Sequence, residues 1–422
     1  MRVLLIGGGG REHALAWKLK QSPLLTRLWC APGNPGIAQV ADCVAIAADD
    51  VKGLLEFARR EQIDFTVVGP EGPLAAGIVD AFTEAKLRIF GPTRVAAELE
   101  SSKAFAKGLF RKHAIPTAGY RVFDRKDSAI TYLEGIPYPA VLKADGLAAG
   151  KGTVICYTFD HAVKTVVDMM EKKAFGDAGL RVVVEEFLTG VEVSVLALTD
   201  GRTILVLDTA QDHKRRDDGD KGPNTGGMGA YSPAPVLTEE GMRAVERDVL
   251  VPTVHAMKRE KRHFEGMLFA GLMMTKDSPK VLEYNVRFGD PETQPLMARM
   301  KSDLLPLLLG SAQGTLEDCS VEWDPRPAMC VVLTSGGYPV AAEKGLPITG
   351  ISEAEKVPGV TVFHAGTALD GQTLVTAGGR VLGVTAIGDT LTQSRDRAYE
   401  AIGKIHFDRM HYRKDIGHQA LR

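Results

Sequence analysis

The chain has 422 residues, of which 45% are hydrophobic and 25% charged, and it contains 45 glycines. This composition is typical of a soluble α/β protein, and the length exceeds what one core serves, so we expect two to four structural units. The formal net charge of -2 excludes an extended basic surface, so nucleic acid is not an expected partner. A local basic pocket for a small phosphorylated ligand remains compatible with this charge.

The cysteines and apolar runs bear on the cellular setting. The five cysteines are scattered, odd in number and form no CxxC pair, which predicts neither a disulfide framework nor a zinc cluster. The apolar stretch at residues 3–6 is too short for a signal peptide, and Pro306 interrupts the apolar run that begins at Leu304. We therefore expect a cytoplasmic protein with no membrane partner.

Residues 1–100 alternate apolar strand patterns with helical ones. Strands are expected at residues 3–6 and around residues 65–69 and 88–91, with a helix after the first. Apolar runs separated by helices predict a doubly wound parallel sheet, which binds ligands beyond the carboxyl ends of its strands.

The remaining chain predicts α+β units. A helix at residues 101–113 precedes two strands joined by a glycine-rich connection within residues 140–157, and residues 266–290 have a hairpin pattern. Residues 211–232 are polar and glycine-rich, which favours an ordered loop over a site. Short strands and turns after about residue 327 predict a small β-rich domain. The expected fold is thus a multidomain α/β and α+β protein, divided at residues 1–100, 101–190, 191–326 and 327–422.

The first glycine cluster, residues 7–10, lies between a strand and a helix. The third glycine of a GxGxxG dinucleotide motif would fall on Glu12 or His13, and the second strand does not end in an acidic residue. Free amides at a helix N-terminus suit a phosphate monoester, and Arg11 adds a positive charge. The alternative is a tight strand–helix turn that binds nothing.

The second glycine cluster, residues 146–152, resembles a P-loop but is one residue short, and Gly152 replaces the Ser or Thr that would hold magnesium. Because it joins two expected strands, a lid over nucleotide phosphates fits better. Lys143 and Lys151 would supply charge there. A lysine on an edge strand is the alternative for Lys143.

Two strand ends carry polar side chains suited to a nucleotide. Residues 185–188 can present backbone groups and a carboxylate to an adenine ring, although solvated charges are common at strand ends. Strand alternation puts Glu283, Asn285 and Arg287 on one face. Glu283 and Asn285 can hold magnesium on a triphosphate, and Arg287 can bind the transferring oxygens; an exposed strand face is the alternative.

These motifs together resemble the ATP-grasp superfamily and, more narrowly, the phosphoribosylamine–glycine ligase family. The resemblance covers almost the whole chain in the family's order and is most specific at GPNTGGMGAYSPAP, residues 222–235, and RFGDPETQ, residues 287–294. It implies a two-lobed ATP-grasp core that joins glycine to 5-phospho-β-D-ribosylamine, giving glycinamide ribonucleotide, ADP and phosphate through glycyl phosphate, in de novo purine synthesis. It also implies ATP and Mg²⁺, with Mn²⁺ as the alternative metal.

The resemblance assigns roles to individual residues. For ATP it implies the phosphate ligands Lys103 and Lys143, the lid residues Gly150 and Lys151, and the adenosine contacts Glu185, Glu186, Phe187 and Glu192. It implies Glu283 and Asn285 as metal ligands and, at the reacting groups, Arg287, Asp212, Lys214 and Asp290, with Asp290 meeting the glycine amine. For phosphoribosylamine it implies Gly8, Gly9, Gly10, Arg11, Glu12, Asn34 and Glu71.

Some alternatives remain open at this point. Residues 269–274 lack the extra acidic metal ligand of many relatives, so Asp208, Asp212 or water would complete the metal shell. Rival interpretations are another ATP-grasp ligase such as a carboxylase, and a nicotinamide enzyme or nucleotide sensor that uses only the N-terminal sheet. We expect a monomer or weak dimer that contacts, transiently, the enzyme supplying phosphoribosylamine.

Overall fold

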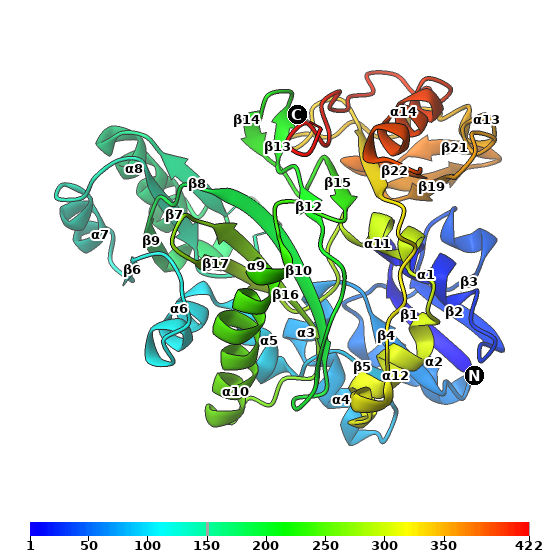
Figure 1. The fold of residues 1–422 in the computed structure, drawn as a ribbon, viewed down its shortest axis with the longest axis horizontal. Helices are drawn as coiled ribbons and strands as arrows, with labels where there is room; N and C mark the ends of the chain where they lie inside the picture. Colours follow the sequence, from blue (N-terminus) through cyan, green and yellow to red (C-terminus); the bar gives the residue numbers. More distant parts are fainter. Residues whose placement is uncertain (149–151, 422) are drawn as a thin grey trace.

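The N-terminal unit of the computed structural model, which describes residues 1–148 and 152–421, is a parallel sheet with helices on both sides (Figure 1). The strand order is β3-β2-β1-β4-β5, and every neighbouring pair is parallel. The first strand is buried along almost its whole length because residues 3–6 are apolar. This confirms the predicted doubly wound sheet. The strands are β1 (Arg2–Gly7), β2 (Arg27–Pro32), β3 (Asp42–Cys43), β4 (Phe65–Val68) and β5 (Ile89–Phe90); the helices are α1 (Gly10–Leu19), η1 (Ile37–Gln39), α2 (Val51–Arg60), α3 (Glu71–Ala76), α4 (Ile78–Glu84) and α5 (Arg94–Ser101).

Two antiparallel sheets follow, one in each lobe of the central region. The small-lobe sheet has the order β6-β9-β7-β8, and the large-lobe sheet has the order β11-β10-β16-β17. The small lobe contains α6 (Lys103–Lys112), β6 (Tyr120–Phe123), α7 (Lys126–Leu133), β7 (Ala140–Ala144), β8 (Thr153–Cys156), α8 (Phe159–Val166), η2 (Val167–Glu171), η3 (Gly176–Leu180) and β9 (Val182–Glu186). The large lobe contains β10 (Val191–Thr199), β11 (Ile204–Val206), α9 (Glu239–Val245), η4 (Glu246–Leu250), α10 (Val251–Arg259), β16 (Gly266–Met274), β17 (Pro279–Asn285), α11 (Thr293–Arg299), α12 (Leu304–Gln313) and η5 (Leu316–Asp318).

The C-terminal sheet takes strands from two distant parts of the chain. Its order is β12-β15-β18-β22-β19, and β12 (Gln211–Asp212) and β15 (Gly229–Ser232) come from the segment for which the sequence predicts an ordered loop. Met228 and Tyr231 pack fully buried in the C-terminal core, which explains why this segment joins that sheet. The other elements are β13 (Arg215–Asp217), β14 (Lys221–Asn224), β18 (Ala328–Thr334), α13 (Ile351–Ala354), β19 (Val360–His364), β20 (Thr367–Asp370), β21 (Thr373–Thr376), β22 (Arg380–Ile387) and α14 (Leu391–Ile402).

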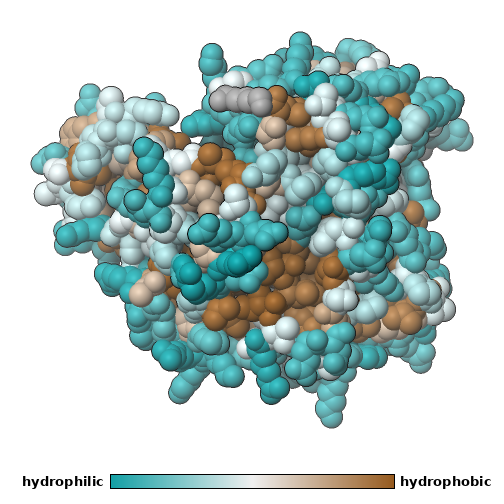
Figure 2. All heavy atoms as spheres, viewed as in Figure 1, coloured by the Kyte–Doolittle hydropathy of each residue, from teal (hydrophilic) through white to brown (hydrophobic). Residues whose placement is uncertain are grey.

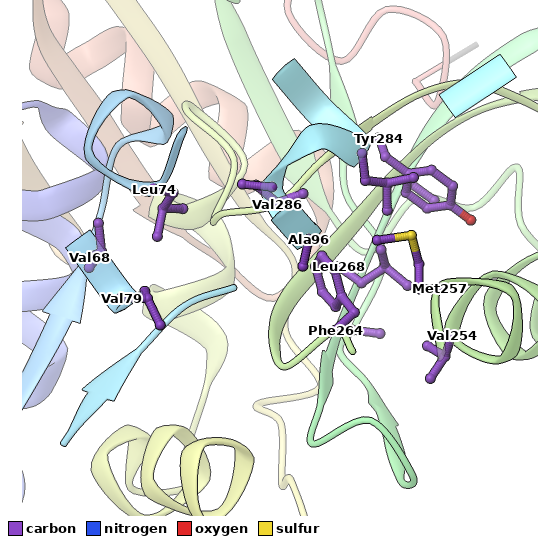
Figure 3. Close-up of a cluster of buried hydrophobic side chains, with 14 of the residues drawn as sticks. Val68, Leu74, Val79, Ala96, Val254, Met257, Phe264, Leu268, Tyr284 and Val286 are labelled. Atoms are coloured by element: carbon purple, nitrogen blue, oxygen red, sulfur yellow. The ribbon is translucent and has the colours of Figure 1, made fainter. Parts of the chain in front are cut away.

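One apolar core joins the N-terminal unit to the large lobe (Figure 3). Val68 and Leu74 of the N-terminal unit belong to the same buried cluster as Leu268 of β16. Tyr284 and Val286 are each 2% exposed and also pack into this core, so the alternating residues of β17 turn to the opposite face. The outer surface is mainly hydrophilic, with an apolar area near the middle of the face in Figure 2.

In the part of the chain that the structure describes, every helix is too short or too polar to cross a membrane.

The shared core supports a prediction for Leu268→Ala. Leu268 is fully buried, so the smaller side chain should lower the free energy of unfolding by about 2–5 kcal/mol, as expected for a large-to-small change in a core. Urea denaturation followed by circular dichroism measures the effect. Val340→Ala, at a position that is 89% exposed, is the matched control and should change it by less than about 0.5 kcal/mol. Equal effects of the two substitutions would contradict the assignment of this core.

Candidate functional site

A cavity of about 1230 Å³ lies between the two lobes and reaches the N-terminal and C-terminal units. Most of the candidate residues line it, although they come from all parts of the chain: Arg11, Glu71, Lys103, Lys143, Glu185, Glu186, Phe187, Glu192, Asp212, Lys214, Glu283, Asn285, Arg287 and Asp290. Gly150 and Lys151 lie outside the described residues. This cavity, hereafter the cleft, is therefore the candidate site.

Two buried lysines and one carboxylate occupy the small-lobe side of the cleft. Lys143 of β7 donates to the carbonyl of Leu282 (2.8 Å), and its Nζ lies 3.1 Å from Glu185 Oε1. Lys107 Nζ lies 2.9 Å from Glu185 Oε2 and donates to Thr117 (2.7 Å). Burial lowers the pKa of Lys107 to about 8, although Glu185 opposes this shift. The Glu185 carboxylate, predicted to meet adenine, is thus held between two lysines.

Sequence reasoning missed Lys107, which lies one helical turn after Lys103 on α6. The sequence did contain a signal for Lys107: it follows Lys103, a candidate phosphate-binding residue, by four positions, and residues i and i+4 share a helix face. Lys103 itself donates to the carbonyl of Gly146, where the glycine-rich connection begins (3.2 Å).

The centre of the cleft holds an ionised carboxylate among cations. Burial alone would raise the pKa of Glu283, but Lys214, Lys143 and Lys103 outweigh it and hold that pKa at about 2. Lys214 Nζ lies 3.8 Å from Glu283 Oε1 and 3.2 Å from Glu192 Oε2. Glu283 is therefore negatively charged at neutral pH and available to a cation.

Arg287 has a ring of oxygen partners. Its Nε donates to Glu71 Oε2 (3.2 Å), and its Nη2 donates to Asn285 Oδ1 (2.9 Å) and lies 3.3 Å from Glu100 Oε1. Glu100 was not predicted; it also accepts the backbone N–H of Val286 (2.7 Å) and so fixes the strand end that carries Arg287. Its signal was weak, since it is an ordinary glutamate inside an expected helix.

β17 offers two oxygen donors suited to a hard divalent cation, which is fewer than the roughly six that such a cation needs. Glu283 offers a carboxylate and Asn285 an amide oxygen, both of which suit magnesium. In residues 1–148 and 152–421, no group of three or more His, Cys, Asp or Glu side chains is placed to hold a metal ion. Asp208 pairs with Arg299 (2.6 Å), whereas Asp212 lines the cleft. Two protein ligands leave most of the shell to water and to substrate oxygens.

Two carboxylates beside this centre, the half-buried Asp212 and the buried Glu292, influence each other electrostatically. Burial raises the pKa of Asp212 well above its usual range, and the neighbouring Glu292 raises it further. Glu292, which sequence reasoning missed, accepts a hydrogen bond from Ser194 (3.1 Å), and burial raises its pKa as well. Such a pair retains a proton more readily than isolated carboxylates do.

Asp290 is tied to the C-terminal unit. Arg380 of β22 donates to Asp290 Oδ2 (2.9 Å) and also reaches the carbonyl of Gly226 (2.5 Å). Gln294 donates to the other Asp290 oxygen (2.8 Å). Arg380, another residue that the sequence did not single out, also lines the cleft and lies 90 positions after Asp290 in the sequence.

The first glycine cluster is fixed by contacts within the protein. Glu12 accepts the N–H of Gly9 (2.7 Å), and a Cβ at Gly8 would lie 2.6 Å from the carbonyl oxygen of Gly33. Asn34 donates to the carbonyls of Gly8 and His364 (both 2.9 Å), and its oxygen accepts two backbone N–H groups. Only two residues of the predicted phosphoribosylamine set, Arg11 and Glu71, line the cleft.

Arg11 bridges this cluster and the cleft. Its Nε donates to Glu12 Oε1 (2.5 Å), its Nη1 donates to the carbonyl of Phe288 (3.1 Å), and Glu71 lies 4.0 Å from it. The helix N-terminus, Arg11 and Glu71 therefore form one connected group at the N-terminal end of the cleft.

The ion pairs of Glu71 predict an acid dependence of stability. Burial would raise its pKa, but Arg287 and Arg11 outweigh it and lower the pKa to about 2. Because the folded pKa is below the unfolded one, this contribution is present above about pH 4.5 and is lost as the pH falls toward 2. Glu71→Gln should therefore lose less stability than the wild type between pH 5 and pH 3, measured as urea midpoints. An equally steep loss in the variant would contradict this charge arrangement.

Family comparisons agree across the whole chain. Residues 1–100 match the N domain of phosphoribosylglycinamide synthetase, residues 101–293 its ATP-grasp domain and residues 328–419 its C domain. A phosphoribosylamine–glycine ligase of Rhodopirellula baltica is 52% identical and spans 99% of this chain and 98% of its own length. One from Escherichia coli is 51% identical and spans 100% and 99%.

Solved structures agree with the sequence comparisons. The crystal structure of phosphoribosylamine–glycine ligase from Thermotoga maritima has a TM-score of 0.85 and 32% identity and covers 98% of this chain and all of its own. A biotin carboxylase domain from Hydrogenobacter thermophilus, at 16% identity and a TM-score of 0.73, shares the fold alone. The three domain matches and the full-length identities show that this chain belongs to the phosphoribosylglycinamide synthetase family.

Proposed function

We propose that the chain joins glycine to 5-phospho-β-D-ribosylamine at the expense of ATP, giving glycinamide ribonucleotide, ADP and phosphate in purine biosynthesis. The observation that carries this proposal is the convergence on one cleft of Lys103, Lys143, Glu283 and Arg287, which are far apart in the sequence. The full-length similarity to phosphoribosylamine–glycine ligases supports the same reaction. A nicotinamide enzyme that used only the N-terminal sheet would leave this convergence without a role.

ATP would lie between the two lobes. Lys103 and Lys143 would meet its phosphates, and Glu192 its ribose. The adenine ring would lie against the end of β9, where Glu185, Glu186 and the 38% exposed Phe187 line the cleft. Because Glu185 is paired with two lysines, we assign it the added task of holding Lys143 in place. Gly150 and Lys151 retain their sequence-based assignment to the lid.

Glu283 and Asn285 would hold Mg²⁺, or Mn²⁺ in its place, because they offer one ionised carboxylate and one amide oxygen on the same strand face. When bound, the metal would neutralise charge on the phosphate oxygens. Asn285 also accepts a hydrogen bond from Arg287, so this arginine lies beside the two residues that would hold the metal.

The chemistry would proceed in two displacements. A glycine carboxylate oxygen attacks the γ-phosphorus, forming glycyl phosphate and releasing ADP; the ribosylamine nitrogen then attacks the carbonyl carbon, loses a proton and releases phosphate. A carboxylate is a poor electrophile, so the first step supplies a leaving group for the second. Arg287 and Lys214 would stabilise the charge on the transferring oxygens, and positioning would supply most of the remaining acceleration. Asp290 would meet the glycine amine, and Asp212 would face the reacting atoms.

Phosphoribosylamine would bind at the N-terminal end of the cleft. Arg11 and Glu71 line it directly, and the amides of Gly8 and Gly10 at the start of α1 would suit its phosphate. The amide of Gly9 already donates to Glu12, so it would need to exchange this partner to reach the phosphate. We assign Glu12 and Asn34 to the support of this loop, because their polar atoms are engaged with backbone groups around it.

We also propose that the domains span residues 1–100, 101–190, 191–326 and 327–422. We propose a cytoplasmic location and a monomer or weak dimer. The chain would contact, transiently, the enzyme that supplies phosphoribosylamine.

An activity assay tests the proposed function. The purified chain should release ADP and phosphate from ATP only when both glycine and freshly prepared phosphoribosylamine are present, and mass spectrometry should detect glycinamide ribonucleotide. Omitting each substrate in turn is the control. Phosphate release that ignores glycine would exclude the ligase.

Glu283→Gln tests the metal site. The substitution keeps the shape of the side chain but removes the negative charge, so we expect turnover to fall at least tenfold and the magnesium concentration needed for half-maximal activity to rise. Asp277→Asn, on the exposed turn between β16 and β17, is the matched control and should leave both quantities unchanged. Unchanged magnesium dependence in Glu283→Gln would remove this residue from the metal site.

A further inference from the structure

The last residues of the chain return to the cleft. Residues 411–420, hereafter the C-terminal strap, run beside the hairpin of β13 and β14, and Figure 1 shows the chain end next to these two strands. This hairpin, residues 215–224, begins immediately after Asp212 and Lys214. The strap also reaches the cleft itself, because Gln419 and Ala420 line it.

Arg413 is the centre of the contact between strap and hairpin. Its side chain is fully buried, and its Nε and Nη2 donate to the two carboxylate oxygens of Asp415 (2.7 and 2.9 Å). Its Nη1 donates to Asp220 Oδ1 (2.8 Å) and to the carbonyl of Arg215 (3.1 Å), both in the hairpin. A buried cation is costly unless it is fully paired, and here the planar guanidinium uses every nitrogen.

The remaining hydrogen bonds run along the hairpin. Asp415 accepts the N–H of Gly219 (2.8 Å), and Asp218 accepts the N–H of Lys414 (2.8 Å). His411 Nε2 lies 3.1 Å from the carbonyl oxygen of Arg216. The tip of the hairpin, residues 218–220, is therefore hydrogen-bonded to the strap at each of its three residues.

The strap also fixes the chain on the N-terminal side of Lys214. Gly417 donates its N–H to His213 Nε2 (3.2 Å), and Gln211 donates to the side-chain oxygen of Gln419 (2.5 Å). Burial and the nearby Arg413 lower the pKa of His213 to about 4, so its ring is neutral and can accept this bond. Lys214 is thus flanked by two residues, His213 and Arg215, whose partners are in the strap.

We infer that the C-terminal strap is a positioning device for the reaction centre, in which Arg413, through Asp220, holds Lys214 and Asp212 toward the cleft. Arg413 acts only through other residues, so it is a positioning residue. The expected effect on kcat rests on the proposed function. The expected ordering of the hairpin by the strap rests on the geometry alone. Neither Lys103 nor Lys143, the proposed phosphate ligands, contacts the strap, so the strap should govern turnover more than ATP binding.

Asp220→Asn is the principal test. The Asp220 side chain is 42% exposed, and the substitution leaves Arg413 paired with Asp415, so the fold should persist with an unchanged melting temperature. We expect kcat to fall about tenfold or more, as misplaced reacting groups do, while KM for ATP changes less than about twofold. Arg395→Gln, which removes an exposed arginine paired with Asp396 on α14, is the matched control and should leave kcat unchanged.

Amide hydrogen exchange provides a second measurement that does not depend on activity. Peptides covering residues 213–224 should exchange faster in Asp220→Asn than in the wild type or in Arg395→Gln, because the hairpin loses its ion pair with Arg413 and keeps the weaker neutral contacts, such as that of the Arg215 carbonyl. Arg413→Lys, which keeps the charge but lacks the planar fork, should give the same kinetic defect as Asp220→Asn.

The outcomes separate the two proposals. Wild-type kcat together with wild-type exchange in Asp220→Asn would overturn the inference, and so would a variant in which KM for ATP rises as much as kcat falls. A wild-type protein without glycine-dependent ADP formation would overturn the proposed function instead. In that case, amide hydrogen exchange of residues 213–224 in Asp220→Asn would still support or overturn the role of the strap in ordering the hairpin.

Discussion

The balance of buried charge in the cleft is the constraint on which the rest of the site depends. Lys143, Lys107, Lys214 and Arg287 are each placed against a carboxylate: Glu185 serves the first two, Glu192 and Glu283 the third, and Glu71 and Glu100 the last. Lys143, Lys107 and the largely buried Arg287 would be expensive to bury without such partners, whereas the side chain of Lys214 is 37% exposed. The protein therefore supplies countercharges of its own to the cations that line the cleft.

This arrangement separates two kinds of cation. Among the described residues, the Lys107 ammonium contacts Glu185, Thr117 and the ring of Tyr120. These contacts occupy most of its donors, so its main role is to fix Glu185, which also pairs with Lys143. Lys214 lies 3.2 and 3.8 Å from two carboxylates, but its side chain is 37% exposed, so a ligand in the cleft can reach it. The first kind builds the site, and the second kind is available to substrates.

Much of the fold follows from local pattern. The parallel N-terminal sheet, the β7–β8 pair, and the β16–β17 hairpin were predicted because each depends on apolar runs and turns that are contiguous in the sequence. The pairing of β15 with β18 was not predicted, because its two strands are almost one hundred residues apart and nothing local in GAYS specifies its partner. The sequence indicates the motif residues of the cleft because phosphate and metal chemistry requires recognisable side chains. It does not indicate a second group, whose members compensate charge: Glu100, Lys107, Glu292 and Arg380. Any segment that the fold brings near can supply such a charge.

The same reasoning explains why the chain commits its C-terminal residues to the reaction centre. The segment around Lys214 is polar and glycine-rich, so it cannot bury enough apolar surface to order itself. Its flanks, Gln211–Asp212 and Gly229–Ser232, enter the C-terminal sheet, whereas β13 and β14 pair with each other in a separate two-stranded sheet. About fifteen residues therefore lie between two anchored ends. Buried, fully paired polar groups are the remaining way to fix such a segment, and Arg413 with Asp220 and Asp415 supplies them. A flexible segment could carry the same lysine, but it would lose conformational entropy at each encounter with substrate. Ordering the hairpin during folding instead removes that cost from the catalytic step.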